Sequence, residues 1–335
     1  MDYLQLARDL IAIESITGNE EGVVACLESR LTELGYAVET WEAAPNRRNL
    51  FAVPSSRVPD GTPVSSVEPS VIFCTHTDTV PPFLPVRENE EHIFGRGACD
   101  TKGITACFVE ACDRLLAEGL DDFGLLFVVG EEVDNVGARS ADERIRGKYV
   151  VVGEPTENQL AVGHKGAYAI TLRVTGVACH SAYPDQGDSA MHRLLAGLQR
   201  ALAEDYGHDE ILGPATINVG RIEGGVAGNV LAPSAEADVV IRVVGPIDEV
   251  EAKFLACFSD QETGELDHRV QVEIHSRMSA PTLERLKGFD EVVVSYGTDI
   301  PFLLKIGRPL LYGPGSILDA HTSDEKISKA AMAKA

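Results

Sequence analysis

Three side chains that could bind metal ions lie within residues 71–103, next to segments with regular patterns. His76 and Asp78 follow the apolar run 71–74, and alternation along an extended chain puts both on the same side. A histidine can bind a metal through one ring nitrogen while a nearby acid fixes the other. Asp100 lies in GRGACDTKG, at the predicted start of a helix over 103–118, where a carboxylate is favoured. Each piece alone could be a polar strand end or a helix cap, but together they suit a metal-bridging carboxylate beside a histidine ligand.

Further acids follow two other apolar segments. Glu131 and Glu132 come directly after the run 125–129, and Glu154 follows the run 149–152. Strands that alternate with helices predict a mainly parallel sheet covered on both faces, and ligands of such sheets lie beyond the carboxyl ends of the strands. A solvated acidic pair is the alternative for Glu131 and Glu132. The convergence of acids and a histidine at strand ends nevertheless favours a metal or catalytic site.

The patterns of the first half predict a doubly wound domain. We expect helices near the amino terminus and over 19–34, 103–118 and 140–147, and strands at 36–41, 49–53, 71–76, 125–129 and 149–152. The segment 54–69, rich in proline and serine, is typical of a loop.

The pattern changes between residues 164 and 275. Strands at 168–176, 215–221, 235–244 and 269–275 and helices at 189–205 and 247–258 make the order β-α-β-β-α-β, which predicts a ferredoxin-like unit. We therefore expect a catalytic α/β domain formed by 1–163 and 276–335, interrupted by an inserted domain at 164–275. The first pattern resumes with strands at 292–295 and 309–312 around a helix at 299–306, and a capping box at 322–325 predicts a last helix. That helix has no stop signal before Ala335, so the natural chain could extend further.

Composition excludes several classes of function. The chain has 335 residues and a formal charge of −23, from 52 acids against 29 lysines and arginines, which disfavours nucleic acids and anionic membranes as partners. Seven cysteines without a C-x-x-C motif predict reduced thiols. The amino terminus has no signal-peptide pattern, and no apolar run is long enough to cross a bilayer. We expect a cytoplasmic protein.

Six motifs occur in order along the chain, namely THTDTVP, GRGACDTKG, GEE, GEPT, CHSAYP and AHTSDE. Together they resemble the M20 family of metallopeptidases and deacylases, and the resemblance covers essentially the whole chain. It implies two zinc ions per chain, with cobalt or manganese as substitutes. One ion would bind His76, Asp100 and Glu154, and the other would bind Asp100, Glu132 and His321.

The resemblance also implies roles for other residues. Glu131 would be the general base, and Asp78 would orient His76. His180 of the inserted domain would stabilise the oxyanion from the partner subunit, which implies a homodimer formed through that domain. Arg242 and Asn229 would hold a substrate carboxylate. By themselves, His180 could be a surface histidine and Arg242 a surface charge on a strand. Residues 297–299 are expected to shape the pocket through their backbone.

The predicted activity is removal of an N-acyl group from an amino acid. N-acetyl-ornithine, cleaved to ornithine and acetate in arginine biosynthesis, is the first candidate substrate. N-succinyl-diaminopimelate is the nearest alternative, followed by dipeptidase or carboxypeptidase activity. From other classes, a non-catalytic metal-binding protein would have lost the base or a ligand, and a nucleotide-binding protein would need a phosphate loop that the sequence lacks. Loop contacts decide the substrate, and the sequence does not specify them.

Overall fold

The computed structural model describes residues 2–260 and 263–335. They form two compact units, each with its own apolar core. Unit 1 comprises the chain up to Val162 together with Thr282–Val292 and Thr298–Ala335, and unit 2 comprises Gly163–Pro281 and Val293–Gly297. Unit 2 therefore runs beyond the predicted 164–275 and takes in a second short segment.

An eight-stranded sheet forms the framework of unit 1, in the order β1-β2-β6-β3-β7-β16-β8-β15. Neighbouring strands from β6 to β16 run parallel, whereas β1, β2 and β8 pair antiparallel. This confirms the predicted α/β class with a mostly parallel sheet. In sheet order the strands are Tyr36–Ala44, Arg47–Pro54, Phe123–Val128, Val71–His76, Tyr149–Val152, Arg308–Leu311, Leu160–His164 and Glu291–Val294.

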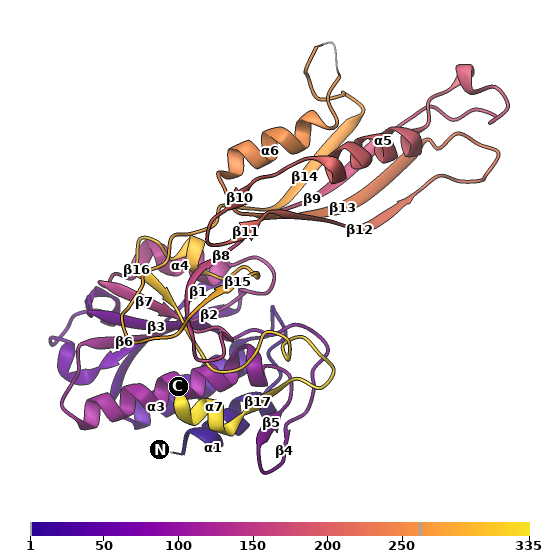
Figure 1. Ribbon diagram of the computed structural model, residues 1–335. Helices are drawn as coiled ribbons and strands as arrows, with labels where there is room; N and C mark the ends of the chain where they lie inside the picture. The colour runs from indigo at the N-terminus through magenta and orange to yellow at the C-terminus, as the bar shows by residue number, and fades with distance from the viewer. Residues whose placement is uncertain (1, 261–262) are drawn as a thin grey trace. The chain divides into compact units, whose positions relative to one another are not determined.

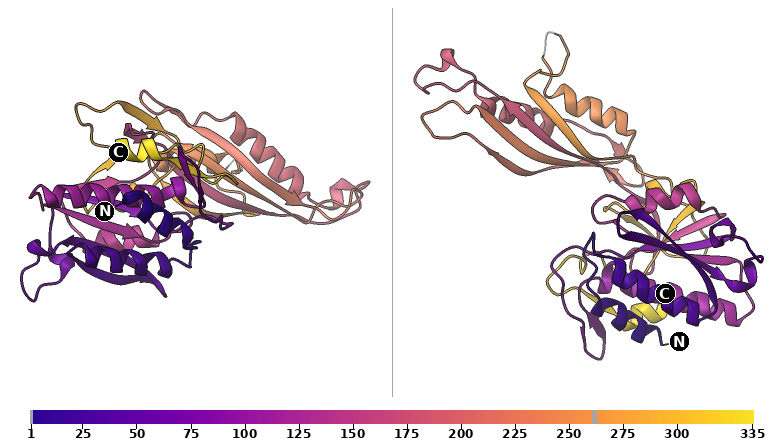
Figure 2. Two further views of the ribbon diagram at one scale, coloured as in Figure 1. Left: turned by 90° about the horizontal axis from the view of Figure 1, so that it is seen from below. Right: turned by 180° about the vertical axis from the view of Figure 1, so that it is seen from behind.

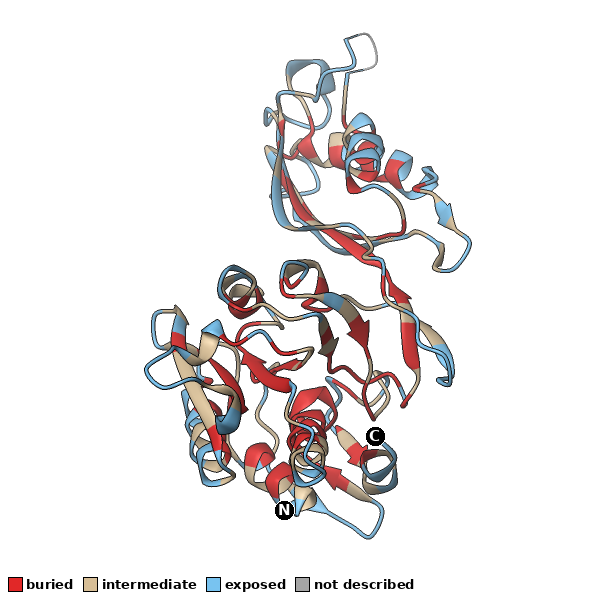
Figure 3. Ribbon diagram, turned by 90° about the vertical axis from the view of Figure 1, so that its left-hand side faces the viewer, coloured by how far each residue is buried: buried red, intermediate tan, exposed pale blue. Residues whose placement is uncertain are grey.

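Helices cover both faces of this sheet. Figure 1 shows α1 (Tyr3–Ala12), α3 (Gly103–Ala117) and α7 (Lys329–Lys334) on one side and α4 (Val136–Arg144) on the other. Helix α2 (Glu21–Glu33) adds its apolar stripe to the core that also contains α1 and α3. Figure 3 shows buried residues gathered on the strands of the sheet and on the helices that cover it. Helix α3 is buried over its first half, from Gly103 to Val109. All six residues of β6 are buried, because a central parallel strand is covered on both faces.

Unit 2 is an antiparallel four-stranded sheet with the order β12-β13-β9-β14. Figures 1 and 2 show its two helices together on one face of the sheet. This is the ferredoxin-like arrangement that the β-α-β-β-α-β pattern predicts. In chain order its main elements are β9 Gly166–Thr175, α5 Ala190–Ala203, β12 Thr216–Gly224, β13 Ser234–Val243, α6 Ile247–Ala256 and β14 Val270–Met278, with a small hairpin of β10 His208–Asp209 and β11 Gly213–Pro214.

The predicted helix at 299–306 is wrong. Only Ile300–Phe302 is helical, as a single 3₁₀ turn. The buried side chains Ile300, Leu303 and Ile306 are three residues apart, and Leu303 and Ile306 donate backbone hydrogen bonds to the residues three before them. A repeat of three matches 3₁₀ turns better than an α-helix, because 3₁₀ geometry has three residues per turn.

The last helix also begins later than the capping box at 322–325 predicts. Residues Lys326–Ser328 form strand β17, which pairs with β5 (His92–Phe94), and β4 (Arg87–Glu88) completes this small sheet. Helix α7 then begins at Lys329, with the Ser328 hydroxyl accepting a hydrogen bond from Ala331 N. The capping box fails because the Glu325 carboxylate binds partners from a distant part of the chain. Among the described residues, no helix is long and apolar enough to cross a membrane.

Candidate metal centre

Asp100 lies in an irregular turn between strand β5 and helix α3. Gly97 begins the turn with φ 84°, a left-handed conformation that glycine adopts without strain. A Cβ atom at Gly97 would lie 2.9 Å from both Lys102 Cδ and Thr79 Cγ2. This turn therefore requires glycine for its conformation and for space, and it carries the Asp100 carboxylate into the interior of unit 1.

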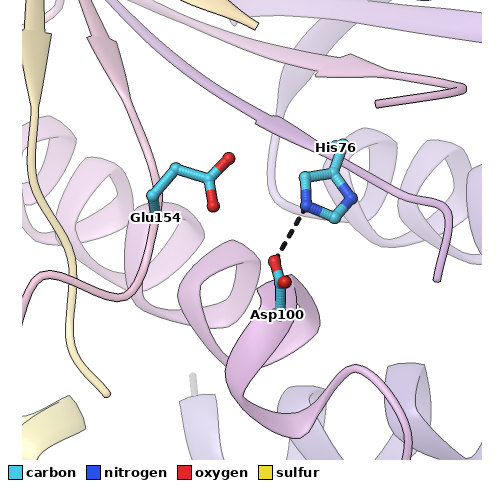
Figure 4. A group of neighbouring side chains, drawn as sticks. All are labelled: His76, Asp100 and Glu154. Atoms are coloured by element: carbon cyan, nitrogen blue, oxygen red, sulfur yellow. Dashed lines mark hydrogen bonds and ion pairs between the residues drawn. The ribbon is translucent and has the colours of Figure 1, made fainter. Parts of the chain in front are cut away.

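The two oxygens of Asp100 face different histidines. His76 Nε2 lies 3.0 Å from Oδ1, and His321 Nε2 lies 3.1 Å from Oδ2. Glu154 completes a group with His76 and Asp100, as Figure 4 shows, and Glu132 completes a second group with Asp100 and His321. The ligand atoms of each group lie within 4.8 Å of one another. The five predicted ligands thus form two candidate metal sites that share one carboxylate.

Asp78 connects His76 to the loop that carries the acids. The His76 Nδ1 atom lies 2.9 Å from the Asp78 carbonyl oxygen, which can only accept, so Nδ1 carries the proton and Nε2 is available for a metal. The Asp78 carboxylate is 3.6 Å from Nδ1. It accepts closer hydrogen bonds from the backbone N–H groups of Gly130 and Glu131, at 2.8 and 3.1 Å, and of Glu132 at 3.2 Å. Asp78 therefore holds the histidine mainly through its main chain and the acidic loop through its side chain.

The site concentrates negative charge on buried carboxylates, of which Glu131 and Glu154 have the most unfavourable surroundings. Burial, followed by repulsion from Glu154, raises the pKa of Glu131 well above its usual range. Burial and repulsion from Asp100 raise the pKa of Glu154 in the same way. Within the described residues, neither acid forms an ion pair with lysine or arginine. Divalent cations would remove this cost, so the residues present fit a pair of metal ions.

The histidines respond to the same charge. Burial would lower the pKa of His76, but hydrogen bonds to Asp100 and Asp78 raise it well above its usual value. Hydrogen bonds to Asp100 and Glu132 raise the pKa of the half-exposed His321 to about 10. Imidazole and carboxylate ligands in this ratio suit zinc, and they also accept cobalt or manganese.

Glu325 is a part of the site that the sequence pattern did not reveal. Its Oε1 atom accepts hydrogen bonds from the backbone N–H groups of Cys99 and Asp100, at 3.1 and 3.2 Å. Its Oε2 atom pairs with Arg96 Nη1 at 2.5 Å, and both side chains are buried. Glu325 thus holds the backbone of the shared carboxylate. Its only sequence signal is its place in AHTSDE, three residues after Thr322, and that spacing predicts a capping box.

The other predicted site residues belong to unit 2. His180 is exposed, and its Nδ1 atom accepts a hydrogen bond from Ala182 N at 3.1 Å. Asn229 is exposed, and its backbone carbonyl oxygen accepts a hydrogen bond from Ser181 N. Arg242 is partly buried on β13, where burial lowers the pKa of its guanidinium, and among the described residues it has no carboxylate partner. The relation of these three residues to the metal centre stays a prediction.

Comparison with known proteins assigns the family. The model of peptidase family M20/M25/M40 matches residues 72–335. A peptidase M20 domain-containing protein of Schizosaccharomyces pombe is 36% identical, over 98% of this chain and 80% of the relative. A probable carboxypeptidase of Aspergillus clavatus is 35% identical, over 99% of this chain and 80% of the relative.

A solved structure supports the fold. The tripeptidase of Staphylococcus aureus superposes with a TM-score of 0.78 at 20% identity, covering 99% of this chain and 94% of the other. The fold and the two ligand groups define a metal-dependent hydrolase. The chain belongs to peptidase family M20/M25/M40, as the motifs of its sequence imply.

Proposed function

We propose that this protein hydrolyses the amide bond between an acyl or peptidyl group and an amino acid that carries a free α-carboxylate. The observation that carries the proposal is the position of Glu131 beside two ligand groups that share Asp100. Among the described residues, this carboxylate has no lysine or arginine partner. An acid in this position belongs to neither group, and each group has three candidate ligands without it. Its environment suits proton transfer.

In this proposal His76, Asp100 and Glu154 would hold one metal ion, and Asp100, Glu132 and His321 the other. Bound ions would polarise the scissile carbonyl and make the attacking water more acidic. Zinc suits this ligand set, with cobalt or manganese as substitutes.

Glu131 would accept a proton from the attacking water and deliver it to the nitrogen of the leaving amine. The burial that raises the pKa of its carboxyl group also makes the carboxylate a stronger base. The backbone hydrogen bond from Glu131 N to Asp78 keeps this residue next to its ligand neighbour Glu132. General acid–base catalysis of this kind contributes about 10²- to 10⁴-fold.

Residues of unit 2 complete the proposal. His180 would donate to the oxyanion from a partner subunit, in a homodimer formed through the inserted domain. Arg242, together with Asn229, would bind the substrate carboxylate. The lack of a carboxylate partner for Arg242 among the described residues supports this role, because guanidinium binds carboxylates in a bidentate manner.

Two substrate classes share the required free carboxylate. The relatives named probable carboxypeptidases favour peptides cleaved at the carboxyl end. The motifs GRGACDTKG and AHTSDE favour N-acetyl-ornithine, which would place the protein in arginine biosynthesis. Both classes require the same proton transfers by Glu131 and differ in the acyl group and in the side chain of the released amino acid.

The test compares kcat/KM of the zinc-loaded protein on N-acetyl-ornithine, N-succinyl-diaminopimelate, a dipeptide and a tripeptide. Each substrate is paired with a control in which the α-carboxylate is amidated. We expect amidation to abolish turnover, and the preferred acyl side identifies the substrate class. Full activity on the amidated controls would overturn the carboxylate requirement.

The second test of the proposed function is a substitution of Glu131, the proposed base. Glu131→Gln keeps the size of the side chain and should lower kcat by about 10²- to 10⁴-fold. Elemental analysis should still find two metal ions per chain. Glu118→Gln, at an exposed position outside the site, is the matched control and should be fully active. An active Glu131→Gln enzyme would remove Glu131 as the base.

A further inference from the structure

Asp299 is a buried carboxylate that is outside both candidate metal groups. Only 2% of this residue is exposed, and its Oδ1 atom accepts a hydrogen bond of 3.0 Å from Asn135 Nδ2. The expectation that residues 297–299 shape the pocket through their backbone stays a prediction, and the Asp299 side chain adds a specific contact that this expectation did not include. Asp299 is the second residue after the chain passes from Gly297 of unit 2 into unit 1.

Asn135 connects this carboxylate to the proposed base. Its Nδ2 atom also donates to the Glu131 carbonyl oxygen at 3.2 Å. An amide nitrogen has two hydrogens, so one group can serve both acceptors. Asn135 has φ 53°, a left-handed conformation that asparagine tolerates better than most residues, and its backbone N–H donates to the Gly130 carbonyl at 2.6 Å. Its side chain is therefore fixed within the acidic loop.

Glu131 is consequently held from two sides. Its N–H donates to the carboxylate of Asp78, which follows strand β3, and its C=O accepts from Asn135, which precedes helix α4. In its ionised form Asp299 decides which way the Asn135 amide points, because an ionised carboxylate can only accept hydrogen bonds. Without it, the amide could rotate and present its oxygen to the Glu131 carbonyl, which would break the contact.

A buried carboxylate at position 299 lowers the stability of the folded protein. Burial raises the pKa of Asp299 to about 7, and Asp78 and Asp134 add repulsion. An asparagine would fill the same volume without a buried charge. A group that costs stability and orients a neighbour of the active site is typical of a functional position.

We propose that Asp299 is a positioning residue, which orients the Asn135 amide and through it holds the backbone of Glu131 in the geometry that proton transfer requires. This inference rests on the proposed role of Glu131 as the base. It assigns a function to the Asp299 side chain, which lies where the chain returns to unit 1.

The first test is Asp299→Asn. We expect kcat to fall about 10- to 100-fold, as displacement of a reacting group by a fraction of an ångström does, while KM changes less than about twofold. Two metal ions should remain bound, and the melting temperature should stay the same or rise because a buried charge is removed. A purely structural role would instead lower the melting temperature and leave kcat of the folded protein unchanged. The loss should persist across the pH profile, whereas a change of charge alone would only shift its acidic limb.

Exchanging the side chains of residues 135 and 299 distinguishes the effect of their hydrogen bond on stability from the effect of the Asn135 amide on Glu131. Asn135→Asp places two carboxylates together and should lower both stability and kcat. The double variant N135D/D299N restores a hydrogen bond between the positions, with the donor now on residue 299, but leaves no donor for the Glu131 carbonyl. We expect the double variant to recover stability without recovering kcat. Asn135→Gly, which keeps the left-handed backbone and deletes the amide, should lose kcat as well.

Full activity of Asp299→Asn or of Asn135→Gly, or recovery of kcat in the double variant, would overturn the inference. Glu131→Gln, assayed in parallel, distinguishes this failure from failure of the proposed function. If Glu131→Gln is inactive and the variants at 135 and 299 are fully active, only the positioning role is wrong. If Glu131→Gln is active, the assignment of the base is wrong.

Discussion

At the scale of single residues, the candidate metal centre depends on how Asp100 is held. Its two oxygens face two histidines, so a small rotation of the carboxylate would weaken both ligand groups at once. Helix α3 does not constrain Asp100 directly, because the residue lies before the helix with φ −128° and ψ 85°. The backbone is held instead by the Glu325 carboxylate, which is itself paired with Arg96.

Glu325→Ala should therefore damage both stability and metal binding. Removal of the carboxylate leaves the buried Arg96 guanidinium without its partner, which typically costs about 3–5 kcal/mol. Loss of the hydrogen bond to Asp100 N should weaken metal affinity about 10- to 100-fold, as loss of a residue that supports a ligand does. Urea unfolding and zinc titration with a competing chelator measure the two effects.

The control is Glu284→Ala. Glu284 also binds an arginine through two contacts, to Arg308 at 2.7 and 2.6 Å, but the Arg308 side chain is 56% exposed. A surface pair of this kind contributes about 1 kcal/mol at most, and it lies outside the metal groups. Equal losses in the two variants would contradict a special role for Glu325.

At the scale of elements, three neighbouring parallel strands account for the convergence of the acids. Strands β6, β3 and β7 are adjacent in the sheet, and each ends at the same edge. His76 is the last residue of β3, and Asp78 lies two residues further along the chain. Glu131 and Glu132 follow β6, and Glu154 follows β7. Parallel strands put their carboxyl ends together, so short loops are sufficient to bring these side chains into contact.

The turn before α3 carries Asp100, the ligand that the two groups share. The role of Gly97 in this turn can be tested by comparing it with Gly119. Gly97 and Gly119 have nearly the same φ, 84° and 82°, but a Cβ atom at Gly119 would meet no atom within 4 Å. Gly119→Ala should cost about 1–2 kcal/mol for the left-handed backbone alone. Gly97→Ala should cost about 1–3 kcal/mol more, because the buried Thr79 and Lys102 side chains must move.

The comparison is made by urea unfolding of both variants, followed by zinc titration. Gly97→Ala should also bind metal more weakly, because Asp100 is three residues away in the same turn. If the two variants unfold at the same urea concentration and bind zinc equally, the turn is not constrained by its packing.

At the scale of the whole molecule, the two units have separate cores. All five candidate ligands belong to unit 1, whereas the core of unit 2 is formed by its own sheet with α5 and α6. A metal that binds the folded state stabilises only the part of the chain that must be folded to bind it. Metal should therefore change the stability of the two units unequally.

Calorimetry should resolve two transitions, of which only one depends on metal. Zinc at about 100 times its Kd adds about 2.7 kcal/mol to the stability of unit 1, and chelation removes it. For a unit of this size the melting temperature should move by about 5–10 °C. Glu154→Gln, which loses a ligand, should suppress the shift. A single transition that moves as a whole with zinc would show that the units unfold together.

Much of the fold was predictable because its signals are local. Buried strands appear as apolar runs, and the acids that follow 125–129 and 149–152 lie at strand ends whatever the rest of the chain does. The β-α-β-β-α-β order of unit 2 likewise follows from patterns within short windows. Short elements depend more on tertiary packing, as the segment 299–306 shows. Its buried residues are three apart, which fits 3₁₀ turns, but the sequence does not mark which of its apolar residues are buried.

By itself, the sequence determined the class of fold, the family motifs and the residue types able to bind metal, because each of these is encoded in contiguous segments. Only the tertiary structure decided which side chains support them. Glu325 reaches Asp100 across 225 positions, and Asn135 reaches Asp299 across 164. A hydrogen bond depends on distance and angle in space, and chain separations of this size leave no local pattern from which to infer the partner. The orientation of the proposed base is for this reason a property of the folded unit and not of the loop that carries it.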